Sequence, residues 1–177
     1  QSALLEAIDE HQAFGGDILI TDPYTGEIKA LFSIRDKNIA ALSAINAPFE
    51  PGSTLKVFTV AALLENGLAD LNDSIDIGNG RWTINGRTLS DVHVESEQVT
   101  LREAFYESSN VGIAKAALVL PEGLHYQSLR DFGFGTRTGI KLPGEVEGVL
   151  RSPDRWSRQS PQSLAIGYEM SATPLQM

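Results

Sequence analysis

One tetrad at the start of an apolar helix constrains this chain more than any other feature. Ser53-Thr54-Leu55-Lys56 follows Pro51-Gly52 directly, and the apolar pattern predicts a helix over residues 53–65 that Asn66-Gly67 ends. A serine and a lysine three residues apart on a helix share one face, with Cβ atoms about 5–6 Å apart. The pair places a hydroxyl beside an amine that can take its proton, which is the minimum for an activated serine nucleophile. The first turn of a helix also favours negative charge, because its backbone N–H groups are unpaired.

A second polar motif, Ser108-x-Asn110, supports the first. An S-x-x-K tetrad occurs about once by chance in a chain of this length, so the tetrad alone is weak evidence. Thr100 and Glu103 form a capping box that predicts a helix running to about Glu107, and a further helix is predicted over residues 111–120. A polar break between two helices is where side chains can point into a cleft.

Composition excludes several classes of function. Fourteen basic against 23 acidic residues give a net charge of −9, which argues against nucleic acid as a partner. The chain has no cysteine, so disulfides and thiolate metal sites are impossible. No apolar run approaches the about 18 residues that span a bilayer. Gln1 opens no signal peptide, so any anchor or targeting segment is expected outside this sequence.

The N-terminal region predicts a helix followed by a β-hairpin. The helix is expected over residues 3–14 with Leu4, Leu5, Ile8 and His11 on one face, and Gly15-Gly16 is expected to end it. Strands are predicted over 18–21 and 27–34, joined by a turn at 22–26. In the second strand Ile28, Ala30, Phe32 and Ile34 alternate with Lys29, Leu31 and Ser33.

The rest of the chain is less regular. Residues 35–50 are mixed, and residues 82–89 predict a small hairpin closed by Asn85-Gly86. Residues 133–148 are rich in glycine and predict an extended surface loop.

Several segments together carry a family resemblance. They are Asp22-Pro23-Tyr24-Thr25-Gly26-Glu27-Ile28, Phe49-Glu50-Pro51-Gly52-Ser53-Thr54-Leu55-Lys56, Glu107-Ser108-Ser109-Asn110-Val111-Gly112-Ile113-Ala114-Lys115, Phe132-Gly133-Phe134-Gly135, Thr138-Gly139-Ile140-Lys141-Leu142-Pro143-Gly144-Glu145 and Ala165-Ile166-Gly167-Tyr168. In this order, over nearly the whole chain, they resemble the transpeptidase domain of class B penicillin-binding proteins.

The resemblance implies an α/β (α+β) fold of the β-lactamase/transpeptidase type. Residues 1–34 would supply a helix and the first two strands of the central antiparallel sheet, and residues 35–177 most of the helical subdomain with both motifs. Residues 1–177 would then be a partial transpeptidase domain.

The implied activity is that of a serine-type D-Ala-D-Ala transpeptidase or carboxypeptidase that cross-links peptidoglycan stem peptides and is acylated by β-lactams. Ser53 would be the nucleophile, with its backbone N–H in the oxyanion hole, and Lys56 the general base. Ser108 would relay a proton, and Asn110 would bind the substrate. No cofactor is expected. Cell-wall synthesis proteins are further implied partners, and the full-length protein is expected to be membrane-anchored with this domain outside the cytoplasm.

One departure from the family is large. No K-[ST]-G triad occurs. Arg137-Thr138-Gly139 lies in the glycine-rich loop, so we interpret it as ordinary loop sequence and not as a substitute for that triad. The sequence is therefore expected to stop before the family's third motif and the remaining C-terminal strands of the sheet. A chain without them is expected to be weakly active or inactive alone.

Three alternatives complete the sequence-based interpretation. A serine β-lactamase would use the same nucleophile, but no E-x-x-L-N motif occurs between Pro121 and Gly148, and class D members carry a hydrophobic residue in place of Asn110. A non-catalytic penicillin-recognising module would keep the fold without the chemistry. A metal pair at Asp91-x-His93 lacks a third ligand and favours loop structure, so no metal site is expected.

Overall fold

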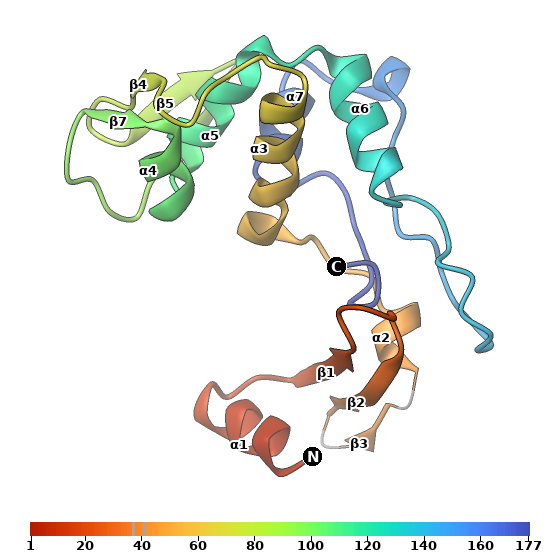
Figure 1. The fold of residues 1–177 in the computed structure, drawn as a ribbon. Coiled ribbons are helices and arrows are strands. Elements are labelled where there is room, and N and C mark those ends of the chain that lie inside the picture. Colours follow the sequence, from red (N-terminus) through yellow and green to blue (C-terminus); the bar gives the residue numbers. More distant parts are fainter. Residues whose placement is uncertain (37, 41) are drawn as a thin grey trace.

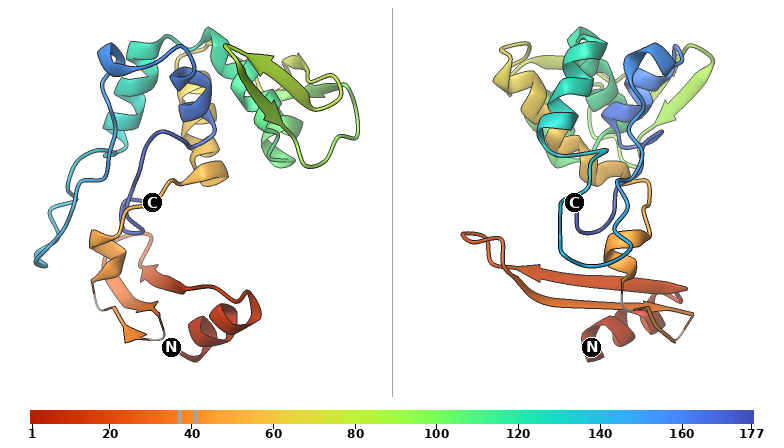
Figure 2. Two further views of the ribbon diagram at one scale, coloured as in Figure 1. Left: turned by 180° about the vertical axis from the view of Figure 1, so that it is seen from behind. Right: turned by 90° about the vertical axis from the view of Figure 1, so that its right-hand side faces the viewer.

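A computed structural model describes residues 1–36, 38–40 and 42–177. Its elements form two groups, an N-terminal sheet with two short helices and a larger, mainly helical part, which lie at opposite ends of the molecule in all three views (Figures 1 and 2). The mixed α/β architecture predicted from the sequence is confirmed.

The N-terminal group is a hairpin extended by a third strand. It contains α1 (Ser2–Glu10), β1 (Gly15–Thr21), β2 (Ile28–Arg35), β3 (Asn38–Ile39) and α2 (Ser43–Asn46). The strands are antiparallel in the order β1-β2-β3, with Ile18 opposite Phe32. Asp22 closes the predicted turn because its Oδ1 accepts from the backbone N–H groups of Tyr24 and Thr25.

Two predictions about this group are wrong. Helix α1 ends at Glu10 instead of residue 14, because Gln12 takes a positive φ of 49° and its N–H turns back to Asp9 O. Gly15 and Gly16 begin β1 and do not end the helix. At Gly15 a Cβ would lie 2.3 Å from Ile34 O, so the close approach of the strands requires glycine there.

The alternation expected in β2 is also incomplete. Ser33, which the alternation places with Lys29 and Leu31 on the face opposite Phe32 and Ile34, is fully buried. Helix α2 packs on β1 and β2, where Ser43 Oγ donates to Asp17 Oδ1 at 2.6 Å and Arg35 Nη2 donates to Asp17 Oδ2 at 2.5 Å. The short helix therefore covers part of the sheet face that the strand pattern alone assigns to solvent.

The larger part is built around the predicted helix after Pro51. A 3₁₀ turn, η1 (Gly52–Leu55), runs directly into α3 (Lys56–Glu65), which ends at Asn66 with Gly67 at φ +61° as predicted. The remaining elements are β4 (Ser74–Asp76), β5 (Arg81–Ile84), β6 (Arg87–Ser90), β7 (Gln98–Thr100), α4 (Leu101–Tyr106), α5 (Asn110–Ala116), η2 (Ala117–Val119), α6 (Glu122–Asp131), η3 (Pro153–Arg155) and α7 (Ser160–Ala165).

Local signals placed several of these elements correctly. Strands β5 and β6 form the hairpin closed by Asn85-Gly86, whose positive φ angles of 49° and 81° suit a two-residue turn. The capping box of Thr100 and Glu103 is present at the start of α4. Residues 133–148 are loop without helix or strand. The β4–β7 pair, α6 and α7 were not predicted.

The core of this part holds α3 between two apolar clusters. One joins α3 to α4 and α5 through residues such as Val60, Leu101 and Ile113. The other joins Leu55 of η1 and Phe58 of α3 to α6 and α7 through Leu129 and Leu164. Helix α3 is thus fixed from both sides, so the position of its first residue is well defined. Within the described ranges, no helix is long and apolar enough to cross a membrane.

His125 of α6 is buried to 2% exposure against Trp156, and no described residue accepts from or donates to its Nε2. Burial lowers its pKa from 6.5 to about 4. The unfolded chain therefore takes up a proton below pH 6.5 while the folded chain does not, so stability is expected to fall between pH 6.5 and about 4, by up to about 3 kcal/mol at 1.36 kcal/mol per unit.

Unfolding in denaturant from pH 7.5 to 4 checks this expectation. His125→Leu should flatten the decline, whereas the same change at the exposed His11, just after α1, should leave it intact. An unchanged decline in His125→Leu would assign the acid sensitivity to other groups.

Candidate active site

Lys56 is the centre of a buried polar cluster. It is the first residue of α3 and only 1% exposed, and its Nζ donates to Ser108 O at 2.6 Å, Ser108 Oγ at 3.1 Å and Asn110 Oδ1 at 2.8 Å. An ammonium carries three protons, so these three acceptors saturate it. The structure therefore brings together Lys56, Ser108 and Asn110, three of the four side chains that the sequence singled out.

Burial changes the proton affinity of this lysine. It lowers the Lys56 pKa from 10.5 to about 8, although the nearby negative charge of Asp91 acts in the opposite direction. About a tenth of such amines are neutral at pH 7, whereas for an ordinary lysine the fraction is below about one in a thousand. A neutral amine within a closed polar cluster can accept a proton.

Ser53 lies three residues before Lys56 in the continuous run of η1 and α3, and it is exposed. Its hydroxyl makes no hydrogen bond to another described residue, in contrast to the other three side chains. The turn that carries Ser53 is anchored one residue earlier, where Gly52 N donates to Gly167 O at 3.0 Å. A fixed backbone thus presents an open hydroxyl on the helical face that also carries the buried amine.

The break between α4 and α5 has an unusual backbone. Ser108 takes a positive φ of 55°, which is uncommon for a residue other than glycine. In this conformation both its carbonyl oxygen and its hydroxyl accept from Lys56 Nζ. Ser109 caps α5 by accepting from Gly112 N at 2.7 Å, so α5 begins at Asn110, one residue earlier than predicted.

Asp91, which the sequence interpretation weighed only as half of a metal pair and assigned to loop structure, is a site residue. Its Oδ1 accepts from the backbone N–H groups of Asn110 and Val111, and its Oδ2 accepts from Ser109 Oγ. Asn110 Nδ2 donates to the neighbouring Ser90 O at 2.9 Å. The only available signal was an acid directly after the Asn85-Gly86 hairpin, which returns the chain toward α5.

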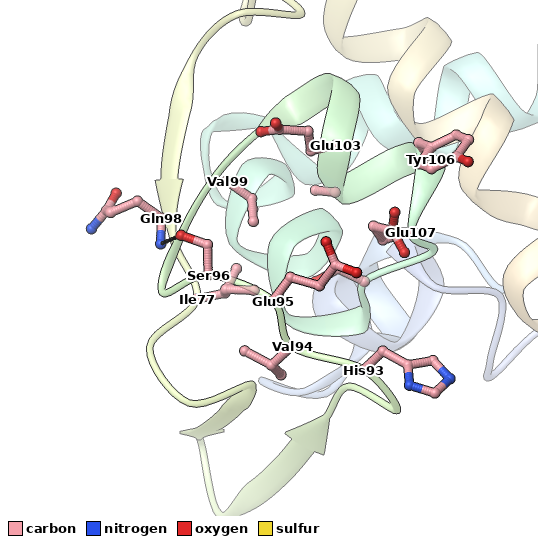
Figure 3. A pocket seen from close by; sticks show the side chains of 12 residues that line it. Ile77, His93, Val94, Glu95, Ser96, Gln98, Val99, Glu103, Tyr106 and Glu107 are labelled. Atoms are coloured by element: carbon pink, nitrogen blue, oxygen red, sulfur yellow. Dashed lines mark hydrogen bonds between the residues drawn. The ribbon is translucent and has the colours of Figure 1, made fainter.

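Asp91 and His93, the two residues of the weak metal candidate, make different contacts. Asp91 binds the start of α5, whereas His93 lines a cavity of about 300 Å³ beside the polar cluster (Figure 3). No group of three or more metal-ligating side chains gathers anywhere in residues 1–36, 38–40 and 42–177. The cavity is lined by Ile77, His93, Val94, Glu95, Ser96, Gln98, Val99, Glu103, Ala104, Tyr106, Glu107 and Ser109.

Arg137-Thr138-Gly139 lies in loop structure, as the sequence interpretation preferred. Glu145 Oε1 accepts from Thr138 N at 2.6 Å and from Thr138 Oγ1 at 2.5 Å, which closes this loop on itself. The triad therefore forms no strand beside Lys56 in the described part of the chain.

The fold and the two motifs have the arrangement of a penicillin-binding protein transpeptidase domain. The family model of the penicillin binding protein transpeptidase domain matches residues 16–177, and the chain belongs to this family, in its class B. The chain is 33% identical over 184 residues to the peptidoglycan D,D-transpeptidase FtsI of Escherichia coli K12, covering 98% of this chain and 31% of that protein.

Solved structures agree with this assignment. The transpeptidase domain of penicillin-binding protein 3 from Burkholderia pseudomallei matches 99% of this chain and 51% of its own, with a TM-score of 0.90 and 26% identity. Penicillin-binding protein 3 from Mycobacterium tuberculosis, solved in complex with aztreonam, matches 99% of this chain and 42% of its own, with a TM-score of 0.89 and 30% identity. The chain spans about a third of the length of the curated FtsI relative.

Proposed function

We propose that this chain is the part of a peptidoglycan D,D-transpeptidase that carries the acylated serine. The observation that supports it most is the burial of Lys56 against Ser108 and Asn110, three residues after an exposed Ser53 at a helix start. The names of the relatives supply the reaction class, since FtsI is a peptidoglycan D,D-transpeptidase. The whole protein's substrates would be peptidoglycan stem peptides.

In the proposed acylation, Ser53 Oγ attacks the carbonyl carbon of the penultimate D-alanine while neutral Lys56 takes the hydroxyl proton. The developing oxyanion receives a hydrogen bond from the Ser53 backbone N–H, a contribution of about 3–4 kcal/mol for a well-placed donor. The tetrahedral intermediate collapses by breaking the peptide C–N bond. The departing D-alanine amine takes a proton that passes from Lys56 through Ser108 Oγ, which lies 3.1 Å from Nζ.

The second half of the reaction reverses these roles. The amine of an acceptor peptide attacks the Ser53 ester, its proton passes to the lysine, and the ester C–O bond breaks to restore the serine hydroxyl. Asn110 would orient the bound peptide, because its Oδ1 and Nδ2 are fixed by Lys56 and Ser90. A β-lactam would enter at the first step, with its ring amide in place of the D-Ala-D-Ala bond.

The proposed site lies on the outer side of the cytoplasmic membrane, where peptidoglycan is assembled. β-Lactams are the proposed inhibitors, since a structural relative was solved with aztreonam.

Labelling with fluorescent penicillin tests the proposal. The intact protein should form one covalent adduct, which peptide mass spectrometry should place on Ser53 and which Ser53→Ala should abolish. Thr54→Ala is the matched control: it removes the neighbouring hydroxyl, which donates to Pro51 O, and the adduct on Ser53 should still form. Rapid turnover of nitrocefin would favour the β-lactamase alternative, and absence of any adduct would favour the non-catalytic module.

Acylation is expected to depend on pH through Lys56. Because the base must be neutral, the second-order rate of penicillin labelling should rise about tenfold per unit below the Lys56 pKa and level off above about pH 8. A stopped-flow or quench series from pH 5.5 to 9.5 measures this profile. A rate independent of pH over this range would contradict the role of Lys56 as base.

A further inference from the structure

The Asp91 carboxylate binds three consecutive residues at the start of α5. Oδ1 accepts from Asn110 N at 2.5 Å and from Val111 N at 3.0 Å, and Oδ2 accepts from Ser109 Oγ at 2.7 Å. These bonds satisfy backbone N–H groups that a helix start leaves unpaired. A single side chain from the segment after β6 therefore fixes the start of α5.

The residues that Asp91 binds are continuous with those that contact the lysine. Ser108 directly precedes Ser109 and holds its strained φ of 55° while its carbonyl and hydroxyl accept from Lys56 Nζ. Asn110 is bound at both ends, by Asp91 at its backbone N–H and by Lys56 at its Oδ1. A movement of the Asp91 carboxylate would shift all three acceptors of the lysine together.

Packing does little to hold the segment that follows Asp91. Val92 is 88% exposed and residues 93–97 are exposed, and residues 93–96 border the cavity of Figure 3. The far end of this segment is tied at Glu97 O, which accepts from Ile77 N at 2.8 Å and from Gly78 N at 3.2 Å. The near end is held at Asp91, whose N–H donates to Gly80 O at 2.9 Å and whose carboxylate binds the start of α5.

Asp91 also acts on the lysine through its charge, which raises the Lys56 pKa against the effect of burial. The other titratable groups of the surrounding elements are those that line the cavity, His93, Glu95, Glu103, Tyr106 and Glu107, and Lys115 of α5, which donates from Nζ to Asp76 O.

We propose that Asp91 is a positioning residue for the serine–lysine site: it holds Ser108 and Asn110 in register with Lys56 and supplies the negative charge that acts on the lysine. Its carboxylate binds Ser109, Asn110 and Val111 and makes no hydrogen bond to Ser53. The proposal rests on the proposed function, because it assigns Asp91 a role in the same acylation.

Two substitutions in the intact protein separate position from charge. Asp91→Asn keeps an oxygen for the two backbone N–H groups and an amide toward Ser109 Oγ, but it removes the charge. Without this charge the Lys56 pKa falls, so the rise of the labelling rate should shift to lower pH by about one unit. The rate on the high-pH plateau should stay near that of the wild type. Asp91→Ala removes every hydrogen bond of the carboxylate and keeps only the backbone bond to Gly80 O. Its labelling rate should fall about 10²-fold at each pH, as expected for reacting groups misplaced by about 1 Å.

Asp76→Asn is the matched control, since Asp76 is an acid in the same region whose Oδ1 binds only Gly78 N among the described residues. Asp76→Asn should leave the pH profile of labelling and its high-pH plateau rate unchanged. If Asp91 had a purely structural role, Asp91→Asn would lower the fraction of folded protein. The folded fraction would then keep the wild-type pH profile of labelling. The proposal is overturned if Asp91→Asn has the wild-type profile, even where Asp91→Ala fails to fold. Failure of the proposed function is distinct, since wild-type protein would then form no adduct on Ser53.

Discussion

Lys56→Arg should abolish penicillin labelling while leaving the fold intact. A guanidinium stays protonated in proteins and cannot act as a base, whereas burial lowers the Lys56 pKa to about 8. The three acceptors supplied by Ser108 and Asn110 would still receive hydrogen bonds from a cation. A general base contributes about 10²–10⁴-fold, so the rate of adduct formation in the intact protein should fall by that factor.

The same substitution at Lys115 is the control. Its Nζ donates to Asp76 O and lies 5.6 Å from the centre of the Trp82 ring, so it is a cation outside the polar cluster. Lys115→Arg should label at the wild-type rate. Lys56→Ala should be as inactive as Lys56→Arg, and also less stable, because it leaves buried acceptors without a donor. Persistent labelling of Lys56→Arg at the wild-type rate would rule out Lys56 as the base.

The sequence predicted the site best where the signal is local. The Ser53–Lys56 spacing, the Thr100–Glu103 capping box and the Asn85-Gly86 turn each depend on residues a few positions apart, and the structure has all three features. Such signals act through backbone geometry that tertiary packing seldom overrides. The convergence of Lys56 with Ser108 and Asn110 was expected from the family resemblance, because no local rule joins residues so far apart.

Features that depend on distant contacts were not predictable in the same way. Asp91 follows a hairpin, and its partners at the start of α5 become neighbours only when the β5–β6 hairpin packs on that helix. Helix α6 was missed because it is polar over most of its length and uses His125 as a core residue beside Leu129. Ser33 is buried because α2 covers the strand, which no alternation within β2 can reveal.

Gly167→Ala should both destabilise the fold and displace Ser53. Gly167 follows α7 at φ +84°, and a Cβ there would lie 2.0 Å from Gly52 O, a backbone atom that cannot move aside alone. Gly52 N donates to Gly167 O, and Ser53 is the next residue, so the clash falls on the turn that carries the proposed nucleophile. Left-handed strain of about 1–2 kcal/mol and overpacking of about 1–3 kcal/mol predict a loss of roughly 2–5 kcal/mol.

Gly139→Ala isolates the effect of the clash. Gly139 has nearly the same φ, +82°, but no described atom lies within 4 Å of the position that a Cβ would take, so only the conformational strain should be felt. Denaturant unfolding should therefore show a clearly larger loss for Gly167→Ala than for Gly139→Ala. Penicillin labelling of the folded fraction should fall about 10²-fold only at Gly167, since a displaced Ser53 no longer meets the reacting carbonyl. Equal unfolding losses with full labelling in both variants would show that the Gly52–Gly167 contact does not position the serine.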